Sequence, residues 1–197
     1  SHSLRREIIA TLVANSLVNR TGATLVADLG EDTGLGPADI ARAFVVARDA
    51  FNFRELWAAI EGLDNQVPAE VQMGMILAVS DLMGQATQWF LQQLPQPIDI
   101  AATVAAYEPG IAAFAVDVGA MLAGLESRTM RDKTKALTRR GVPRDIALQV
   151  AALDGMRSAC HVVHAALASE RPVDEVGRIY FSVGAELGLD WLRSAAE

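Results

Sequence analysis

Apolar residues recur every three or four positions along most of the 197-residue chain, which is the spacing of one face of an α-helix. In the first such segment, residues 4–20, Leu4, Ile8 and Leu12 form a stripe that Ile9 broadens. No segment alternates apolar and polar residues between turn markers, as a half-buried strand does. The pattern predicts an all-α fold, a multi-helix bundle of about ten helices without significant sheet.

The expected helices are separated by short breaks that contain glycine and proline. One helix begins at Ile98 and is expected to stop or kink before Pro109, because proline lacks the N–H that an interior helical residue donates. We expect a single helical domain over residues 4–197, with possible halves at 4–94 and 98–197. The expected helices span 4–20, 23–31, 37–51, 53–65, 68–94, 98–108, 110–123, 126–140, 143–153, 156–168 and 173–187, and a final turn covers 190–197.

A repeated outline, proline followed two residues later by an acid, accompanies five of the predicted helix starts. Proline is tolerated at the first helical position, and an acid in the first turn is favoured by the helix dipole. Because the copies are unequally spaced, stacked structural repeats are disfavoured. We interpret the outline as helix-start chemistry at Pro37, Pro68, Pro97, Pro143 and Pro172.

The composition limits the classes of function. The net charge of −7 disfavours a protein that follows a phosphate backbone, so no nucleic-acid partner is expected. A single cysteine excludes an internal disulfide and fits a reducing compartment, so we expect a cytoplasmic protein. The chain starts with Ser1 rather than methionine, and residues 1–3 are expected to be a remnant left by cleavage.

The most apolar stretch, residues 109–125, is the candidate for a membrane span. It carries Asp117 near its middle and many alanines, whereas a spanning helix needs about 20 strongly apolar residues. We therefore expect a buried helix and no membrane partner.

No catalytic, cofactor-binding or metal-binding residue is predicted. The chain contains no GxSxG elbow, P-loop or HExxH helix. Residues 28–39 have the length of a calcium-binding loop but lack its glycine and closing glutamate, which favours an acidic loop between helices. Cys160, His161 and His164 share one helix and could supply a ligand pair, but a buried thiol and ordinary histidine hydrogen bonds are the favoured interpretation.

Basic residues concentrate in residues 127–141. A solvated helix face explains them best, while an acidic protein partner or a nucleic acid stays open as an alternative. A helix-turn-helix over residues 139–153 would be a further, less favoured interpretation. The basic residues are Arg128, Arg131, Lys133, Lys135, Arg139 and Arg140.

Several segments together resemble one family. "LRREIIAT", "ANSLVNRTG", "DIARAF", "ELWAAIEGLDNQVP" and "IYFSVGAELGLDWL" are similar to the extreme C-terminal helical region of the large bacterial NAD-specific glutamate dehydrogenases. The resemblance runs from Leu4 to about Arg193. It implies an accessory domain of a homo-oligomeric enzyme that converts L-glutamate, NAD and water to 2-oxoglutarate, ammonium and NADH. NAD would be bound by the parent enzyme and by no residue of this fragment.

The resemblance implies contact with the upstream catalytic domain or with a neighbouring subunit, in a scaffolding, oligomerisation or regulatory role. An alternative is a sensor for an amino-acid effector, whose pocket the adaptable side chains of Met73, Met75 and Met83 could line. The residues expected to contact a partner are polar or aromatic, although Trp57 could equally lie in the core with the polar row solvated. They are Arg6, Asn15, Asn19, Arg20, Trp57, Glu61 and Asp64.

Overall fold

The computed structural model describes residues 4–22 and 24–187, and over these ranges the backbone forms ten α-helices and no strand. The predicted all-α class is confirmed. The predicted remnant at residues 1–3 and the final turn at 190–197 lie outside the described ranges. The helices are α1 (Arg5–Thr21), α2 (Thr24–Thr33), α3 (Pro37–Ala50), α4 (Phe53–Glu61), α5 (Ala69–Gln93), α6 (Ile100–Met121), α7 (Gly124–Arg139), α8 (Arg144–Met156), α9 (Ala159–Ser169) and α10 (Val173–Glu186).

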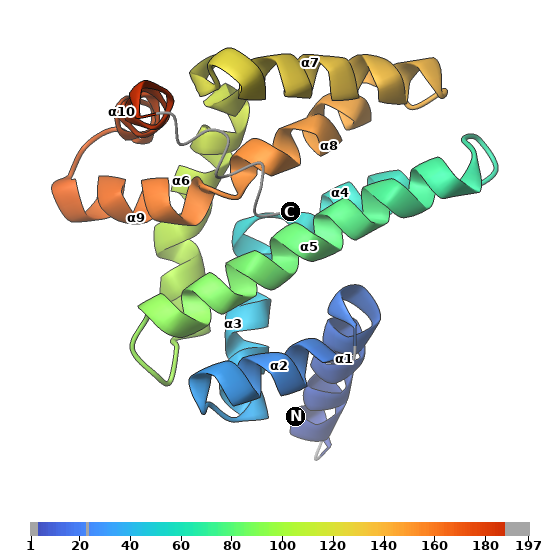
Figure 1. Cartoon of the computed structure of the whole chain (residues 1–197). Coiled ribbons are helices and arrows are strands. Elements are labelled where there is room, and N and C mark those ends of the chain that lie inside the picture. The colour runs from blue at the N-terminus through green and yellow to red at the C-terminus, as the bar shows by residue number, and fades with distance from the viewer. Residues whose placement is uncertain (1–3, 23, 188–197) are drawn as a thin grey trace.

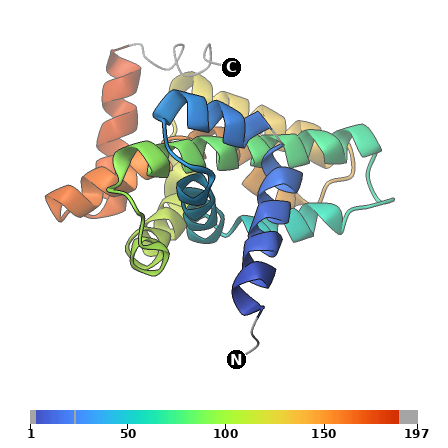
Figure 2. The same ribbon diagram turned by 90° about the horizontal axis from the view of Figure 1, so that it is seen from below.

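Two long helices organise the bundle. The helix α5 packs against α3, α4 and α8, and α6 packs against α3, α8, α9 and α10. In Figure 1, α1 and α2 lie on one side of α5, and α7 and α8 lie on the other. Figure 2 shows the N-terminal end of α1 projecting away from the remaining helices. The interior is filled by large side chains, among them the fully buried Phe44, Phe90 and Phe114.

The expected stop before Pro109 is wrong, because α6 runs without interruption from Ile100 to Met121. A proline inside a helix costs about 3 kcal/mol or more. Tyr107 and Ile111, on either side of the proline, are both buried, so packing of the two halves against the bundle offsets that cost. Among the described residues, α6 alone is long and apolar enough to cross a membrane by length and composition, and 28% of its most apolar window is buried.

The acidic loop expected between helices within residues 28–39 is shorter than predicted, because the helix expected over 23–31 extends two residues further. The helix α2 continues to Thr33, and residues 34–36 alone link it to α3. Leu29 anchors this last stretch in the core, and the Thr33 hydroxyl donates to the Leu29 carbonyl. Burial of one apolar side chain thus extends the helix through a segment whose charges resemble those of a loop.

The proline outline marks helix starts as expected, with a shift in position. Pro37 is the first residue of α3, whereas Pro68, Pro143 and Pro172 each lie immediately before the first helical residue. Before α6 the outline is shifted further, so that Asp99 caps the helix by accepting a hydrogen bond from the Ala102 N–H at 3.0 Å. These prolines therefore direct the chain into the helix from an extended conformation.

Candidate docking surface

The first helix presents large apolar side chains to the outside. Leu12 is 63% exposed, and Leu4, Ile8 and Ile9 are each about half exposed. We call Leu4, Ile8, Ile9 and Leu12 the α1 apolar face. Leu17, on roughly the opposite side of the helix, is buried where α1 packs on α3 and α5. The stripe predicted from the sequence therefore points away from the bundle in its N-terminal half.

Two amides continue the same stripe toward the C-terminal end of α1. Ile8, Leu12, Asn15 and Asn19 are spaced four, three and four residues apart, which places them on one side of a helix. Both asparagines are exposed. The outward side of α1 thus changes from apolar to polar along its length, as the centre and rim of an interface do.

Three of the residues expected to contact a partner instead form contacts between the last turn of α1 and α4. The guanidinium carbon of Arg20 lies 4.6 Å from the centroid of the Trp57 ring, and its Nη1 donates to Glu61 Oε1 at 2.5 Å. Trp57 is only 3% exposed, so Arg20 covers its ring. The Trp57 Nε1–H has no hydrogen-bond partner among the described residues. We call this set the Arg20 clasp, and it adds a contact with α4 to the packing of α1 on α3 and α5.

The remaining expected contact residues lie apart from the clasp or outside the description. Asp64 is exposed in the turn after α4, where Asn65 Nδ2 donates to its Oδ2 at 3.2 Å. Arg6 is part of α1, and its side chain lies outside what the structure describes.

A second polar cluster lies where α9 meets α5 and α6. The Trp89 Nε1–H donates to His161 Nδ1 at 3.2 Å, and Tyr107 Oη lies 2.7 Å from His164 Nδ1. Cys160 is buried, and burial raises the pKa of its thiol, so the group stays protonated. The predicted histidine hydrogen bonds and buried thiol are confirmed. The described residues contain no group of three or more side chains arranged to hold a metal ion.

The basic segment singled out in the sequence lies mainly on α7. Among the described residues of α7 none is buried, so the basic segment forms a solvated helix face, with Lys133 Nζ bound to Asp154 Oδ2 at 2.9 Å.

Of the methionines expected to line a pocket, Met75 and Met83 are core residues and Met73 is exposed. A cavity of about 110 Å³ lies instead beside Trp89, Arg157 and His161, and residue spacing in the sequence gave no signal for it.

Comparison with known proteins places the whole chain in one family. The family model described as "Glutamate dehydrogenase, C-terminal" matches residues 1–197. The chain is similar to NAD-specific glutamate dehydrogenases of Halomonas elongata (37% identity over 97% of the chain), Pseudomonas aeruginosa (35% over 96%) and Mycobacterium tuberculosis (29% over 99%). It spans 12% of the length of each of these relatives. The chain belongs to the glutamate dehydrogenase C-terminal domain family.

Proposed function

We propose that this chain is a non-catalytic docking domain of a large NAD-specific glutamate dehydrogenase, with the α1 apolar face seated against the preceding part of the same polypeptide. The observation that carries the proposal is that exposed face. Isolated apolar residues on a surface are ordinary, whereas a contiguous stripe of four large ones on a single helix indicates a covered surface.

The size of the face favours an occupant that is covalently linked. Because the four side chains are already about half buried, covering them contributes roughly 3–6 kcal/mol in total, which does not exceed the cost of about 4–15 kcal/mol of bringing two free molecules together. A linked partner has an effective concentration of about millimolar or more, so a small interface suffices. The family model describes a C-terminal region, and the relatives are far longer than this chain, so a long preceding polypeptide would be at hand.

The Arg20 clasp supports a docking role, because it joins α1, which carries the exposed apolar face, to α4. Arg20 holds α1 against α4 through both the Trp57 ring and Glu61, so the exposed stripe is already oriented before any partner arrives. Asn15 and Asn19 would supply hydrogen bonds at the polar rim. A domain built in this way would act as a scaffold, an oligomerisation element or a regulatory module for the parent homo-oligomer in the cytoplasm.

Under this proposal the chemistry takes place elsewhere in the parent enzyme. Oxidation of L-glutamate to 2-oxoglutarate and ammonium with reduction of NAD would use catalytic and cofactor residues upstream of Leu4. This chain would contribute docking energy alone. A second candidate function, sensing of a small molecule, is favoured by the cavity beside Arg157 and His161.

The test compares NAD-dependent glutamate oxidation by three proteins: the isolated chain, the parent enzyme, and the parent truncated before Leu4. We expect no turnover by the isolated chain and an altered oligomeric state or a reduced kcat/KM in the truncated parent. Oligomeric state is read by light scattering coupled to size exclusion. Turnover by the isolated chain defeats the accessory role, and an unchanged oligomer with unchanged kinetics defeats the scaffolding role.

Point variants locate the docking surface within the parent. Leu12→Asp places a charge on the α1 apolar face, and Leu77→Asp makes the same change at a leucine of α5 that is 55% exposed. We expect only Leu12→Asp to reproduce the effect of the truncation, because burying an unpaired carboxylate is costly. Equal effects of the two variants would contradict docking through α1.

A further inference from the structure

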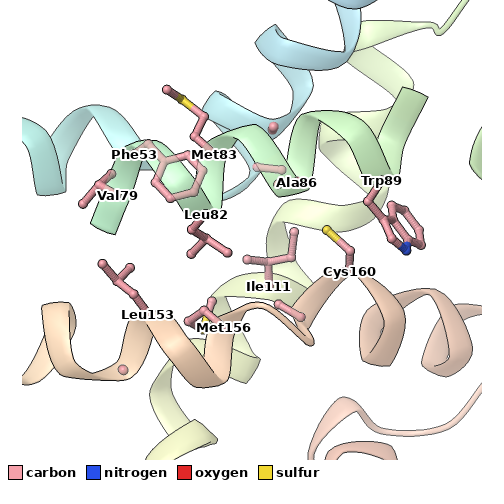
Figure 3. Close-up of a cluster of buried hydrophobic side chains, with 14 of the residues drawn as sticks. Phe53, Val79, Leu82, Met83, Ala86, Trp89, Ile111, Leu153, Met156 and Cys160 are labelled. Carbon is pink, nitrogen blue, oxygen red and sulfur yellow. The ribbon is translucent and has the colours of Figure 1, made fainter. Parts of the chain in front are cut away.

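A small cavity opens between α5 and the junction of α8 with α9. Its volume is about 110 Å³, and its apolar walls include Phe51, Leu82 and Trp89. Figure 3 shows Leu82 and Trp89 projecting from α5 toward the helices that carry Met156 and Cys160. Drug-sized ligands occupy pockets of about 300–1,000 Å³, so this cavity suits a short-chain compound.

Among the described residues that line the cavity, Arg157 alone carries a formal charge. The residue is half-buried, and its guanidinium makes no ion pair or hydrogen bond with any residue that the structure describes. The neighbouring acid, Asp154, is bound to Lys133 instead. A partly desolvated guanidinium without a counter-ion is unfavourable, and a planar carboxylate satisfies it through two parallel hydrogen bonds.

The other polar groups on the wall can also donate. His161 Nδ1 accepts the Trp89 indole hydrogen, so in the neutral ring the proton is carried by Nε2 and remains available as a donor. Burial, and then the electrostatic interaction with His164, lowers the pKa of His161 and favours this neutral form. Gln85 adds an amide, and none of the lining residues that the structure describes is acidic.

We propose that this cavity binds a short-chain carboxylate, with the carboxylate group on Arg157 and the hydrocarbon chain against Phe51, Leu82 and Trp89. The apolar walls favour a carbon chain over a compact inorganic anion, which would leave them in contact with water. Phosphate, with more charge, would also require more than one cation. The site is independent of docking through α1 because it is lined by α5, α9 and the residues that follow α3 and α8.

The experiment titrates the isotope-labelled chain with sodium butanoate at constant ionic strength and follows the indole N–H signal of Trp89 by NMR. The signal is assigned by its loss in Trp89→Phe. Butanamide has nearly the same shape without the charge, and inorganic phosphate has the charge without the chain. We expect a saturable shift with butanoate, at least about tenfold weaker binding of butanamide, and no saturable shift with phosphate.

Substitutions at the cation provide the second arm. Arg157→Gln is expected to weaken butanoate binding at least about tenfold, and Arg157→Lys, which keeps the charge without the planar fork, to weaken it by less. Arg128→Gln, at an exposed arginine of α7, removes the same charge elsewhere and should leave the affinity unchanged. The lysine variant also distinguishes loss of a ligand contact from loss of fold, since its spectrum should stay dispersed like that of the parent chain.

Several results would overturn the proposal. If butanoate gives no saturable shift, the cavity does not bind a short-chain carboxylate. If butanamide or phosphate binds as tightly as butanoate, the cavity does not select a carboxylate ligand. Unchanged affinity in Arg157→Gln, or an equal loss in Arg128→Gln, shows that Arg157 does not hold the ligand.

Discussion

The helices α1 and α5 carry similar apolar stripes and use them differently. The helix α5 buries nine of its 25 residues, including Met83 and Phe90, between helices on several sides. The helix α1 buries Leu17 and leaves the whole α1 apolar face at least 48% exposed. An amphipathic pattern therefore establishes which side of a helix requires a partner. It does not establish whether that partner belongs to the same folded unit.

The same distinction explains the polar residues of the two regions. Around α5 and α9, polar side chains are satisfied internally, as when Trp89 donates to His161. Around α1, Asn15 and Asn19 face outward on the continuation of an apolar stripe. Stability should accordingly depend on α5 and docking on α1, and the predictions that follow separate these two roles.

The largest difference in the free energy of unfolding is expected between two leucine-to-alanine substitutions, one in α5 and one in α1. Leu91→Ala removes a side chain that is 2% exposed in α5 and should lower the free energy of unfolding by about 2–5 kcal/mol through loss of burial and creation of a cavity. Leu12→Ala removes a side chain that is 63% exposed in α1 and should change it by about 0.5 kcal/mol or less. Urea unfolding followed by circular dichroism measures both. A loss of more than 2 kcal/mol in Leu12→Ala would show that the α1 apolar face is already covered within this chain.

The sequence predicted the fold class and most helix positions, because an Ala- and Leu-rich chain with a three-to-four residue period has few other ways to bury its apolar face. It missed the continuation of one helix through Pro109 and ended another two residues early, before residues 32–33. In both places local signals favoured a break, and burial of neighbours such as Ile111 and Leu29 favoured a helix. Tertiary contacts of this kind lie outside the reach of local propensity.

The second prediction concerns how closely the core helices approach. A Cβ at Gly110 of α6 would lie 2.7 Å from Val163 Cγ1 on α9, whereas a Cβ at Gly74 of α5 would meet no atom of the described residues within 4 Å. Gly110→Ala should destabilise the chain by about 1–3 kcal/mol, since the branched valine cannot move aside freely. Gly74→Ala should stabilise it by up to about 1 kcal/mol through helix propensity. The two melting temperatures should move in opposite directions, and a shared direction would contradict the packing described for α6 on α9.

A smaller effect is expected at the Arg20 clasp. Arg20→Met keeps the aliphatic stem and removes the charge that interacts with Trp57 and Glu61. We expect a local loss of about 1 kcal/mol, seen as roughly fivefold faster amide hydrogen exchange in α1 with little change in α5. Glu61→Gln removes only a half-exposed ion pair and should have a smaller effect. If the two variants loosen α1 equally, the Trp57 ring contributes nothing to the clasp.

The sites were less accessible from the sequence than the fold. The sequence predicts no catalytic signature, and it offers Arg20, Trp57 and Glu61 as partner-contact residues because they are polar or aromatic residues in segments that resemble a family. The cavity was missed because Phe51, Gln85 and Arg157 are far apart in the sequence and follow no spacing rule. An arginine without a carboxylate partner becomes informative only when its burial and surroundings are known.

The smallest predicted effect concerns the polar contact between α5 and α9. Burial, and then the electrostatic interaction with His164, lowers the pKa of His161 below its ordinary value of 6.5, and the Trp89 indole N–H further requires an unprotonated Nδ1. As pH falls, the unfolded chain therefore binds this proton before the folded chain does. The stability contributed by neutral His161 is present above the ordinary pKa and is lost as pH falls from there through the lower folded value. An NMR titration of the His161 ring should give a pKa below 6.5, and Trp89→Phe should raise it. Tyr107→Phe is the control, because it removes the contact with His164 and should leave the Trp89–His161 hydrogen bond intact. A His161 pKa at or above 6.5 in the unmodified chain would contradict the neutral tautomer assigned to His161.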